Sequence, residues 1–314
     1  MFKKPAQKYS GKICEVEIGT GEKAIKLGGE AVLPFYGFDG NTGNPPKVGM
    51  EISDVYPEDW IEPLKELYKD VSNDTVKWAK FVEEKYNPDF ICLRLVSADP
   101  NGDDTSPEDC AKKVKEVVEA IKTPLVVAGT GNHEKDAKLF EKVAQAAEGH
   151  NVLLMSAVED NYKTVAAAGV LAYNNKVVAE SAVDINLAKQ VNILINQLGI
   201  DNEKIVANIG CSAGGYGYEY VISTLDRVKL AALTQNDKTL QVPIITPISF
   251  ETWKVKESVE PESSTPEWGN QEERGISMEV AAAAGVLTSG SDAVILRHPK
   301  SVETVRTFVK ELLG

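Results

Sequence analysis

Short apolar runs of strand length recur along this chain, and a longer amphipathic stretch follows each one. There are eight: Val48–Ser53, Phe90–Val96, Leu125–Gly129, Val152–Ala157, Val177–Ser181, Ile205–Ile209, Val242–Thr246 and Ala293–Arg297. An eightfold alternation of strand and helix predicts an α/β fold, a (β/α)8 TIM barrel of parallel strands. Chemistry in such barrels lies at the carboxyl ends of the strands, so the residues that follow each run become the candidates.

We expect residues 1–314 to form a single TIM-barrel domain, with a hairpin and lead-in over 1–47 and the barrel over 48–314. The hairpin is predicted over residues 12–28, because Cys14, Val16 and Ile18 alternate with acidic residues before a Gly-Thr-Gly turn. A hairpin at this point can cover the bottom of the barrel, the face that serves stability.

Helix signals support the alternation. Ser106 and Pro107 are typical of a helix start, Asp184 precedes an apolar face at helical spacing that stops at Gly199, and Asn161 opens the helix after the fourth strand. The last helix is expected from about Ser301 to Leu313.

The connection from Ser249 to Asn270 is predicted to lack regular structure. A stretch of this length inside a compact domain is usually functional or disordered, and its two tryptophans, Trp253 and Trp268, favour contact with a ligand or partner.

Composition excludes several classes of partner. The chain has 34 Lys and Arg against 47 Asp and Glu, a formal charge of −13, which argues against nucleic acid or an anionic membrane as a partner. The N-terminus lacks the apolar core of a signal peptide and no run approaches membrane-spanning length, so we expect a cytoplasmic protein. Cys14, Cys92, Cys110 and Cys211 have neither zinc nor iron–sulfur spacing.

The strand ends carry mainly polar side chains. They supply Ser53, Asp54, Ser97, Asp99, Asn101, Asp103, Asp104, Thr130, Asn132, His133, Glu159, Asn161, Ser181, Asp184, Asn208, Ser249, Phe250 and His298. No lysine stands where a Schiff-base enzyme needs one, and three histidines in all are too few for a clustered zinc site. His133 is expected at the surface, and His298 is as compatible with packing as with a site. Neither a catalytic residue nor a metal site is predicted.

The run Gly210 to Gly217 follows the sixth strand. Its glycines would let the backbone approach a flat or anionic ligand, but a tight strand-to-helix turn explains it equally well. The dinucleotide fingerprint is not met. These residues suit binding of a large preformed cofactor, or a pterin, better than covalent catalysis.

Several segments together resemble one family. They are Gly49 to Pro57, Ala98-Asp99-Pro100, Glu159 to Lys163, Asp184 to Gln190, Gly215 to Tyr220, Trp268-Gly269 with Glu273-Arg274-Gly275, and Arg297-His298-Pro299. As an ordered set they resemble the small (delta) subunit of the corrinoid iron–sulfur protein of the carbon monoxide dehydrogenase/acetyl-CoA synthase system. Relatives usually carry Asp-Pro at the sixth strand end, where this chain has Asn208-Ile209 before Gly210.

The resemblance implies a heterodimeric methyl carrier. A large subunit would hold the [4Fe–4S] cluster and a cobalamin domain, and the corrinoid would lie between that domain and the barrel mouth. The methyl group would come from methyltetrahydrofolate through a separate methyltransferase and pass to acetyl-CoA synthase. This chain would position and shield the cofactor rather than transfer protons.

The residues expected to contact the corrinoid are Asp99, Ser181, Asp184, Asn208, Ser212, Gly214, Gly215, Tyr216, Ser249, Phe250 and His298. Two other interpretations remain. One is a free-standing pterin-dependent methyltransferase, with Asp99, Asn161 and Asp184 holding the pterin. The other is a metal-dependent aldolase or hydrolase that binds a divalent ion at Asp99 to Asp104.

Overall fold

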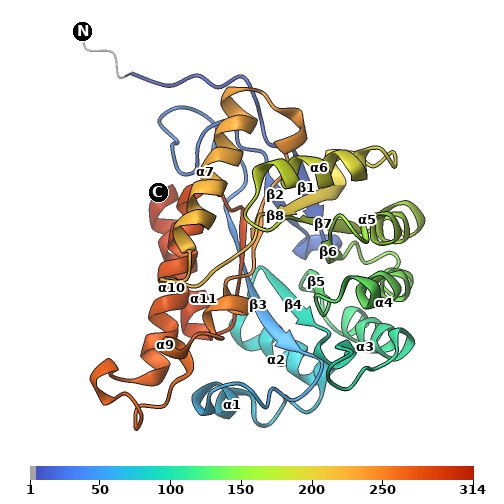
Figure 1. Cartoon of the computed structure of the whole chain (residues 1–314), viewed down its shortest axis with the longest axis vertical. Coiled ribbons are helices and arrows are strands. Elements are labelled where there is room, and N and C mark those ends of the chain that lie inside the picture. The colour runs from blue at the N-terminus through green and yellow to red at the C-terminus, as the bar shows by residue number, and fades with distance from the viewer. Residues whose placement is uncertain (1–4) are drawn as a thin grey trace.

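The computed structural model describes residues 5–314 and contains an eight-stranded parallel sheet (Figure 1). Its strands are β3 (Lys47–Ser53), β4 (Phe90–Arg94), β5 (Leu125–Ala128), β6 (Leu153–Ala157), β7 (Lys176–Glu180), β8 (Ile205–Asn208), β9 (Ile245–Thr246) and β10 (Ala293–Leu296). They pair in the order β8-β7-β6-β5-β4-β3-β10-β9. A single parallel bridge from Ala207 to Ile244 brings β8 to the segment leading into β9, so the sheet nearly closes. The predicted TIM barrel is confirmed.

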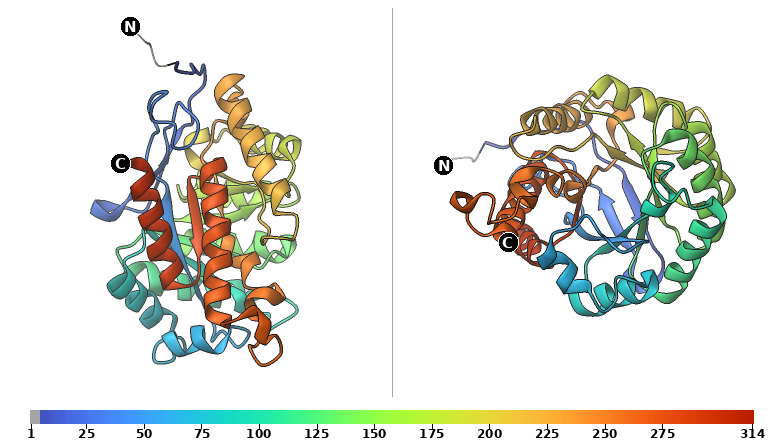
Figure 2. Two further views of the ribbon diagram at one scale, coloured as in Figure 1. Left: turned by 90° about the vertical axis from the view of Figure 1, so that its left-hand side faces the viewer. Right: turned by 60° about the horizontal axis from the view of Figure 1, so that its bottom comes forward.

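Helices cover the outside of the sheet, as the view along the barrel axis shows (Figure 2, right). They are α1 (Glu62–Tyr68), α2 (Thr75–Tyr86), α3 (Pro107–Ala120), α4 (His133–Ala146), α5 (Tyr162–Ala166), α6 (Ile185–Asn196), α7 (Tyr218–Thr234), α8 (Ile248–Thr252), α9 (Lys256–Val259), α10 (Gln271–Ser289) and α11 (Pro299–Leu313). Ser106 and Asp184 cap α3 and α6 as the sequence predicts. Among the described residues, no helix is long and apolar enough to cross a membrane.

The N-terminal hairpin closes the bottom of the barrel, as predicted. Its strands β1 (Glu15–Ile18) and β2 (Ile25–Gly28) are antiparallel and joined by a 3-10 turn. Side chains from both strands, such as Val16 and Leu27, join the apolar cluster inside the barrel. In Figure 2 (right) the blue hairpin lies at the far end of the barrel, behind the ring of strands. Burial of apolar side chains therefore plugs the base and leaves the other end for a site.

Alternation along the strands decides which side chains enter the barrel. Val48, Met50 and Ile52 of β3 pack outward in the cluster shared with the helices. Gly49 and Glu51 therefore point inward, and a Cβ on Gly49 would come within 2.1 Å of the Phe90 ring. The same alternation turns Cys92 and Arg94 of β4 inward, together with Ile295 of β10 and Arg297 directly after it.

A buried ion cluster fixes the lead-in to the base. The Lys229 ammonium on α7 donates to the Glu30 carboxylate and, at 2.8 Å, to Asp292, which precedes β10. Asp292 also accepts the backbone N–H of Ile244 at 2.7 Å. Burial raises the pKa of Asp292 to about 7, a shift that the Glu30 charge reinforces and the Lys229 charge opposes. The cluster thus ties α7, the lead-in and the two closing strands together.

The segment from Ser249 to Asn270 is more ordered than the sequence predicts. It contains the end of α8, α9 and a 3-10 turn at Pro266–Trp268. Arg274 on α10 donates to the carbonyl oxygens of Glu257 and Glu260, each at 2.6 Å, and so satisfies the end of α9. The expectation of a structureless connection was therefore wrong, because contacts with α10 order helices too short to form alone.

Candidate functional site at the barrel mouth

A buried charged trio forms the top layer of the barrel interior. Glu51 of β3 accepts from Arg297 after β10 at 3.0 Å (Nη2 to Oε1) and 3.2 Å (Nε to Oε2). It also accepts from Arg94 Nη1 of β4 at 3.0 Å. Glu51 is 1% exposed and Arg297 5%. Strand pairing of β10 with β3 and of β3 with β4 places the three side chains side by side.

Electrostatics keep this trio ionised. Burial disfavours the carboxylate, but the Arg297 and Arg94 guanidiniums outweigh burial and lower the pKa of Glu51 to about 2. Two aromatic rings complete the setting: Arg94 stacks over Phe250 and Arg297 over Trp60, each 4.3 Å from the ring centroid. The trio carries one net positive charge, fixed on rigid strands.

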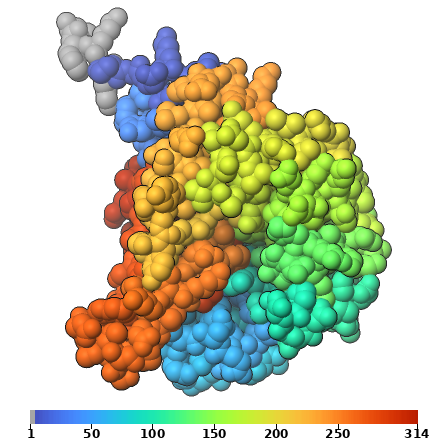
Figure 3. Space-filling model, viewed as in Figure 1, coloured from blue at the N-terminus to red at the C-terminus, as the bar shows by residue number. Residues whose placement is uncertain are grey.

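Two predicted residues lie beside the trio. Phe250 on α8 forms the Arg94 stack, and Ser249 is fully buried near Glu51, with a hydroxyl that has no hydrogen-bond partner among the described residues. The space-filling view shows the surface hollowed between the orange segment containing α8 and α9 and the green helices (Figure 3). This face of the molecule is thus hollowed, and of the trio only Arg94 is partly exposed.

His298 is the N-cap of α11. Its Nδ1 accepts from the backbone N–H of Lys300 at 3.1 Å, so its Nε2 carries the proton and donates to Glu272 at 3.0 Å. Burial lowers the pKa of His298, and the ring stacks on Trp253. Because both ring nitrogens are hydrogen-bonded, His298 caps α11 and packs against Trp253 at the side of the mouth.

Glu279 on α10 is a buried acid beneath this wall. Its carboxylate accepts the Trp253 indole N–H at 3.0 Å and the backbone N–H groups of Arg297 at 2.6 Å and His298 at 3.2 Å. Burial raises its pKa against these hydrogen bonds. Glu279 therefore positions the chain after β10, and with it the Arg297 side chain.

Asp54, at the end of β3, is held in the same way. It accepts the Ser97 backbone N–H at 3.0 Å, the Ser97 hydroxyl, and the Lys113 ammonium at 3.1 Å. Its carboxylate links the mouth loops after β3 and β4 to α3. Asp54, Glu51 and Glu279 are thus all committed to internal partners.

Asp99 and Asp184 lie on the rim and not in the interior. Asp99 accepts from the backbone and side chain of Asn101 in its own turn. Asp184 caps α6 by accepting from the N–H groups of Asn186 and Leu187 at 2.7 and 3.2 Å. Asn161 likewise turns to its own loop, where its Oδ1 accepts from Val158 N–H at 2.9 Å.

Ser181 directly follows β7, Asn208 is the last residue of the neighbouring β8, and both are buried at the mouth. Asn208 Oδ1 accepts the Gly210 N–H at 3.0 Å. Ser181 Oγ is buried without a hydrogen-bond partner among residues 5–314. Close by, Val183 adopts a left-handed φ of 51°, which is strained for a β-branched residue. The strained backbone of Val183 and the unpaired hydroxyl of Ser181 thus lie on the same side of the mouth.

The Gly-rich turn after β8 lies across the rim. The Ser212 hydroxyl donates to the Tyr216 carbonyl, while Gly214 and Gly215 are exposed. Tyr216 is 50% exposed, and its hydroxyl donates to Glu257 of α9 at 2.8 Å. The turn and the α9 segment are therefore latched together above the depression.

Sequence reasoning missed Glu51, Arg94 and Arg297 as site residues. The signal that could have found them is a charged residue within an apolar run, or directly after it, at a position whose side chain the strand alternation points into the barrel. Sequence reasoning also missed Glu180, which alternation points inward on β7 next to Asn208.

Among the described residues there is no group of three or more His, Cys, Asp or Glu placed to hold a metal.

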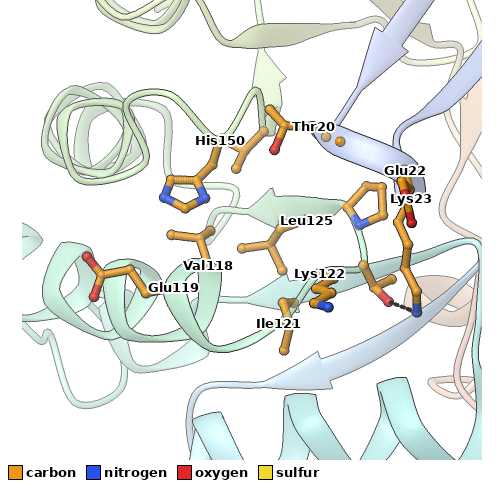
Figure 4. Close-up of a pocket in the computed structure, with 14 residues that line it drawn as sticks. Thr20, Glu22, Lys23, Val118, Glu119, Ile121, Lys122, Leu125 and His150 are labelled. Atoms are coloured by element: carbon orange, nitrogen blue, oxygen red, sulfur yellow. Dashed lines mark hydrogen bonds between the residues drawn. The ribbon is translucent and has the colours of Figure 1, made fainter.

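One cavity lies away from the mouth. A cavity of about 590 Å³ lies at the base, between the hairpin turn and the end of α3, where Thr20 and His150 face an apolar floor of Val118, Ile121 and Leu125 (Figure 4). It is remote from every strand end that the sequence singled out.

Solved structures similar to the chain include dihydropteroate synthases. A dihydropteroate synthase from Xanthomonas albilineans with 4-aminobenzoic acid has a TM-score of 0.60 at 12% identity, covering 96% of this chain and 99% of that one. One from Coxiella burnetii with pteroic acid has a TM-score of 0.58 at 11% identity, covering 96% and 100%. Identities this low establish the barrel fold alone.

Sequence comparisons are more specific. The chain is 34% identical to the acetyl-CoA decarbonylase/synthase complex subunit delta of Methanothermobacter thermautotrophicus, over 99% of this chain and 80% of that protein. It is 32% identical to the subunit delta of Methanocaldococcus jannaschii, over 98% and 76%. The family model for the CO dehydrogenase/acetyl-CoA synthase delta subunit matches residues 15–307. The chain belongs to this delta-subunit family.

Proposed function

We propose that the chain is the small subunit of a corrinoid methyl carrier. It would pair with a large subunit that holds cobalamin and a [4Fe–4S] cluster. The carrier would take a methyl group that originates from methyltetrahydrofolate through a methyltransferase and deliver it to acetyl-CoA synthase. Membership in the delta-subunit family supports a role within that complex.

One observation carries the proposal: three buried acids of the mouth, Glu51, Asp54 and Glu279, already have partners. Glu51 is held by two arginines, Asp54 by Ser97 and Lys113, and Glu279 by Trp253 and two backbone N–H groups. A general acid or base must be free to exchange a proton with a substrate. The mouth is accordingly suited to holding and shielding a cofactor.

The polar groups around the mouth match a corrinoid, whose rim carries amide side chains. Such amides need both donors and acceptors, which Ser181, Asn208 and Tyr216 can supply. The unsatisfied Ser181 hydroxyl is the observation that best fits an added ligand. When bound, the corrinoid supplies the methyl-carrying chemistry, while this chain orients the ring and excludes water.

The alternative of a free-standing pterin methyltransferase is less well supported. A pterin ring is recognised through hydrogen bonds that a free carboxylate accepts, and the Glu51 carboxylate in the barrel interior is bound to Arg94 and Arg297. The dihydropteroate synthases share the fold at 11–12% identity.

Coexpression with the large subunit tests the proposal. We expect a stable one-to-one complex that carries a corrinoid absorbance spectrum and transfers a methyl group to acetyl-CoA synthase faster than the large subunit alone. Binding of methyltetrahydrofolate to the isolated chain, with no effect on the corrinoid, would support the pterin alternative and overturn ours.

A further inference from the structure

Two lysines converge on a cavity at the base of the barrel, opposite the mouth. Lys176 is the first residue of β7, and Lys204 ends the turn Asn202–Lys204 that leads into β8. Both line a cavity of about 710 Å³, bordered by the hairpin turn that includes Thr20. Thr20 also borders the cavity in Figure 4, so both cavities adjoin the hairpin turn.

These lysines have few partners. Lys176 is 6% exposed, and its ammonium donates to Asn151 Oδ1 at 2.6 Å. Lys204 donates to Asn174 Oδ1 at 2.7 Å. Within the described part of the chain, no carboxylate lies within 4.0 Å of either ammonium. An ammonium has three N–H donors, so each retains donors that no protein acceptor uses.

Lys229 provides the contrast. It is the other deeply buried lysine at the base, and two carboxylates neutralise it. A buried cation is normally paired, and a pair of unneutralised ammonium groups repel each other. Burial and the nearby Lys204 charge lower the pKa of Lys176 to about 8, while Glu17 acts in the opposite direction. The two acids that line the same cavity, Glu17 and Glu148, are exposed at its edge.

We propose that this cavity binds a phosphate-bearing small molecule, with the Lys176 and Lys204 ammonium groups contacting the phosphate oxygens. Lysine binds phosphate as a point charge, and two lysines match a doubly charged phosphate group. The cavity volume lies within the range of small-molecule sites and is larger than the volume that a single inorganic ion occupies. Asn151, Asn174 and the Tyr173 ring line the remaining wall. The inference is independent of the function proposed at the mouth.

Calorimetric titration of the full chain tests the inference. Inorganic phosphate, AMP and ATP are titrated at constant ionic strength into wild type, Lys204→Gln and the control Lys238→Gln, which removes an exposed positive charge from a nearby turn. We expect saturable binding, weakened at least tenfold by Lys204→Gln and unchanged by Lys238→Gln. Tighter AMP or ATP binding identifies an organic phosphate as the ligand, and equal affinity identifies inorganic phosphate.

A second readout follows Lys176 directly. NMR titration of its ε-carbon should show that bound phosphate raises the Lys176 pKa, because the anion stabilises the charged ammonium. The inference is overturned if none of the three compounds binds saturably at millimolar concentration, or if Lys204→Gln binds them as tightly as wild type.

Discussion

Glu51 on β3 and Arg297, directly after the neighbouring strand β10, are joined by two parallel hydrogen bonds of 3.0 and 3.2 Å inside the barrel. This bidentate pair turns the centre of the mouth into a fixed charge and not a reactive group. Arg94 adds a third member from β4. The proposed function depends on these hydrogen bonds, since a carboxylate bound to two arginines cannot exchange a proton with a substrate.

Glu51→Gln should destabilise the protein strongly. The variant leaves the Arg94 and Arg297 guanidiniums buried without their counter-charge, a loss of about 3–5 kcal/mol for a broken buried pair. Urea denaturation measures it. Glu66→Gln, which breaks an exposed pair with Lys69 on α1, is the control and should leave the midpoint unchanged. Equal midpoints for Glu51→Gln and wild type would contradict the role of the trio.

Stability should fall in acid through Glu51. Its folded pKa of about 2 lies below its ordinary value of 4.5, so the folded state prefers the carboxylate. The stabilisation is fully present above about pH 4.5 and is lost as the pH falls toward 2; it amounts to something on the order of 3 kcal/mol. Carbon-13 NMR of the carboxyl group reports this titration directly. A Glu51 midpoint at or above pH 4.5 would refute the assignment.

Lys229→Met should destabilise the base, and more so at high pH. The raised pKa of Asp292, about 7, means that its contribution to stability is present below about pH 4 and declines as the pH rises through 7. Without the ammonium, Glu30 and Asp292 face each other, and their charges are more costly at pH 8 than at pH 5. Denaturation of wild type and variant at both pH values measures the difference. A difference in unfolding free energy that does not grow with pH would exclude this coupling.

Tyr216→Phe should loosen the rim without lowering stability. The variant loses the hydrogen bond to Glu257 that joins the Gly-rich turn to α9. Hydrogen exchange by mass spectrometry should show faster exchange over residues 210–217 and 256–260. Tyr220→Phe is the matched control, since its exposed hydroxyl makes no hydrogen bond in the described chain. Identical exchange in both variants would show that no latch exists.

The sequence predicted the barrel well because strand and helix periods alternate clearly over 48–314. It placed the seventh strand at Val242–Thr246, where regular pairing covers only Ile245–Thr246, because the barrel closes there through a single bridge. It missed the trio of Glu51, Arg94 and Arg297. A charged residue within an apolar run can be identified as a site residue only after the strand alternation shows that its side chain points into the barrel. The left-handed backbone of Val183 could not be predicted, since a β-branched residue ordinarily avoids it; in the fold its N–H donates to the Ile209 carbonyl at 2.9 Å.

The predicted strand-end residues differ in what their polar atoms do in the folded protein. Ser181, Asn208, Ser249 and Phe250 do lie at the mouth, as strand ends must in a barrel. Asp99, Asp184 and His298 also follow strands, yet their polar atoms satisfy turns and helix starts. A strand-end position cannot distinguish a capping residue from a ligand contact, because both use the same short polar side chains. Contact of any of them with a corrinoid stays a prediction.

The central claim is that the barrel mouth covers a corrinoid held by the large subunit. The most direct measurement is the rate at which an added alkylating reagent reaches the reduced corrinoid in the large subunit alone and in its complex with this chain. We predict slower alkylation in the complex than in the large subunit alone. Gly214→Trp, which adds bulk at the open rim, should partly restore the rate, and the control Gln145→Trp on α4 should not. Equal rates with and without this chain would contradict the account.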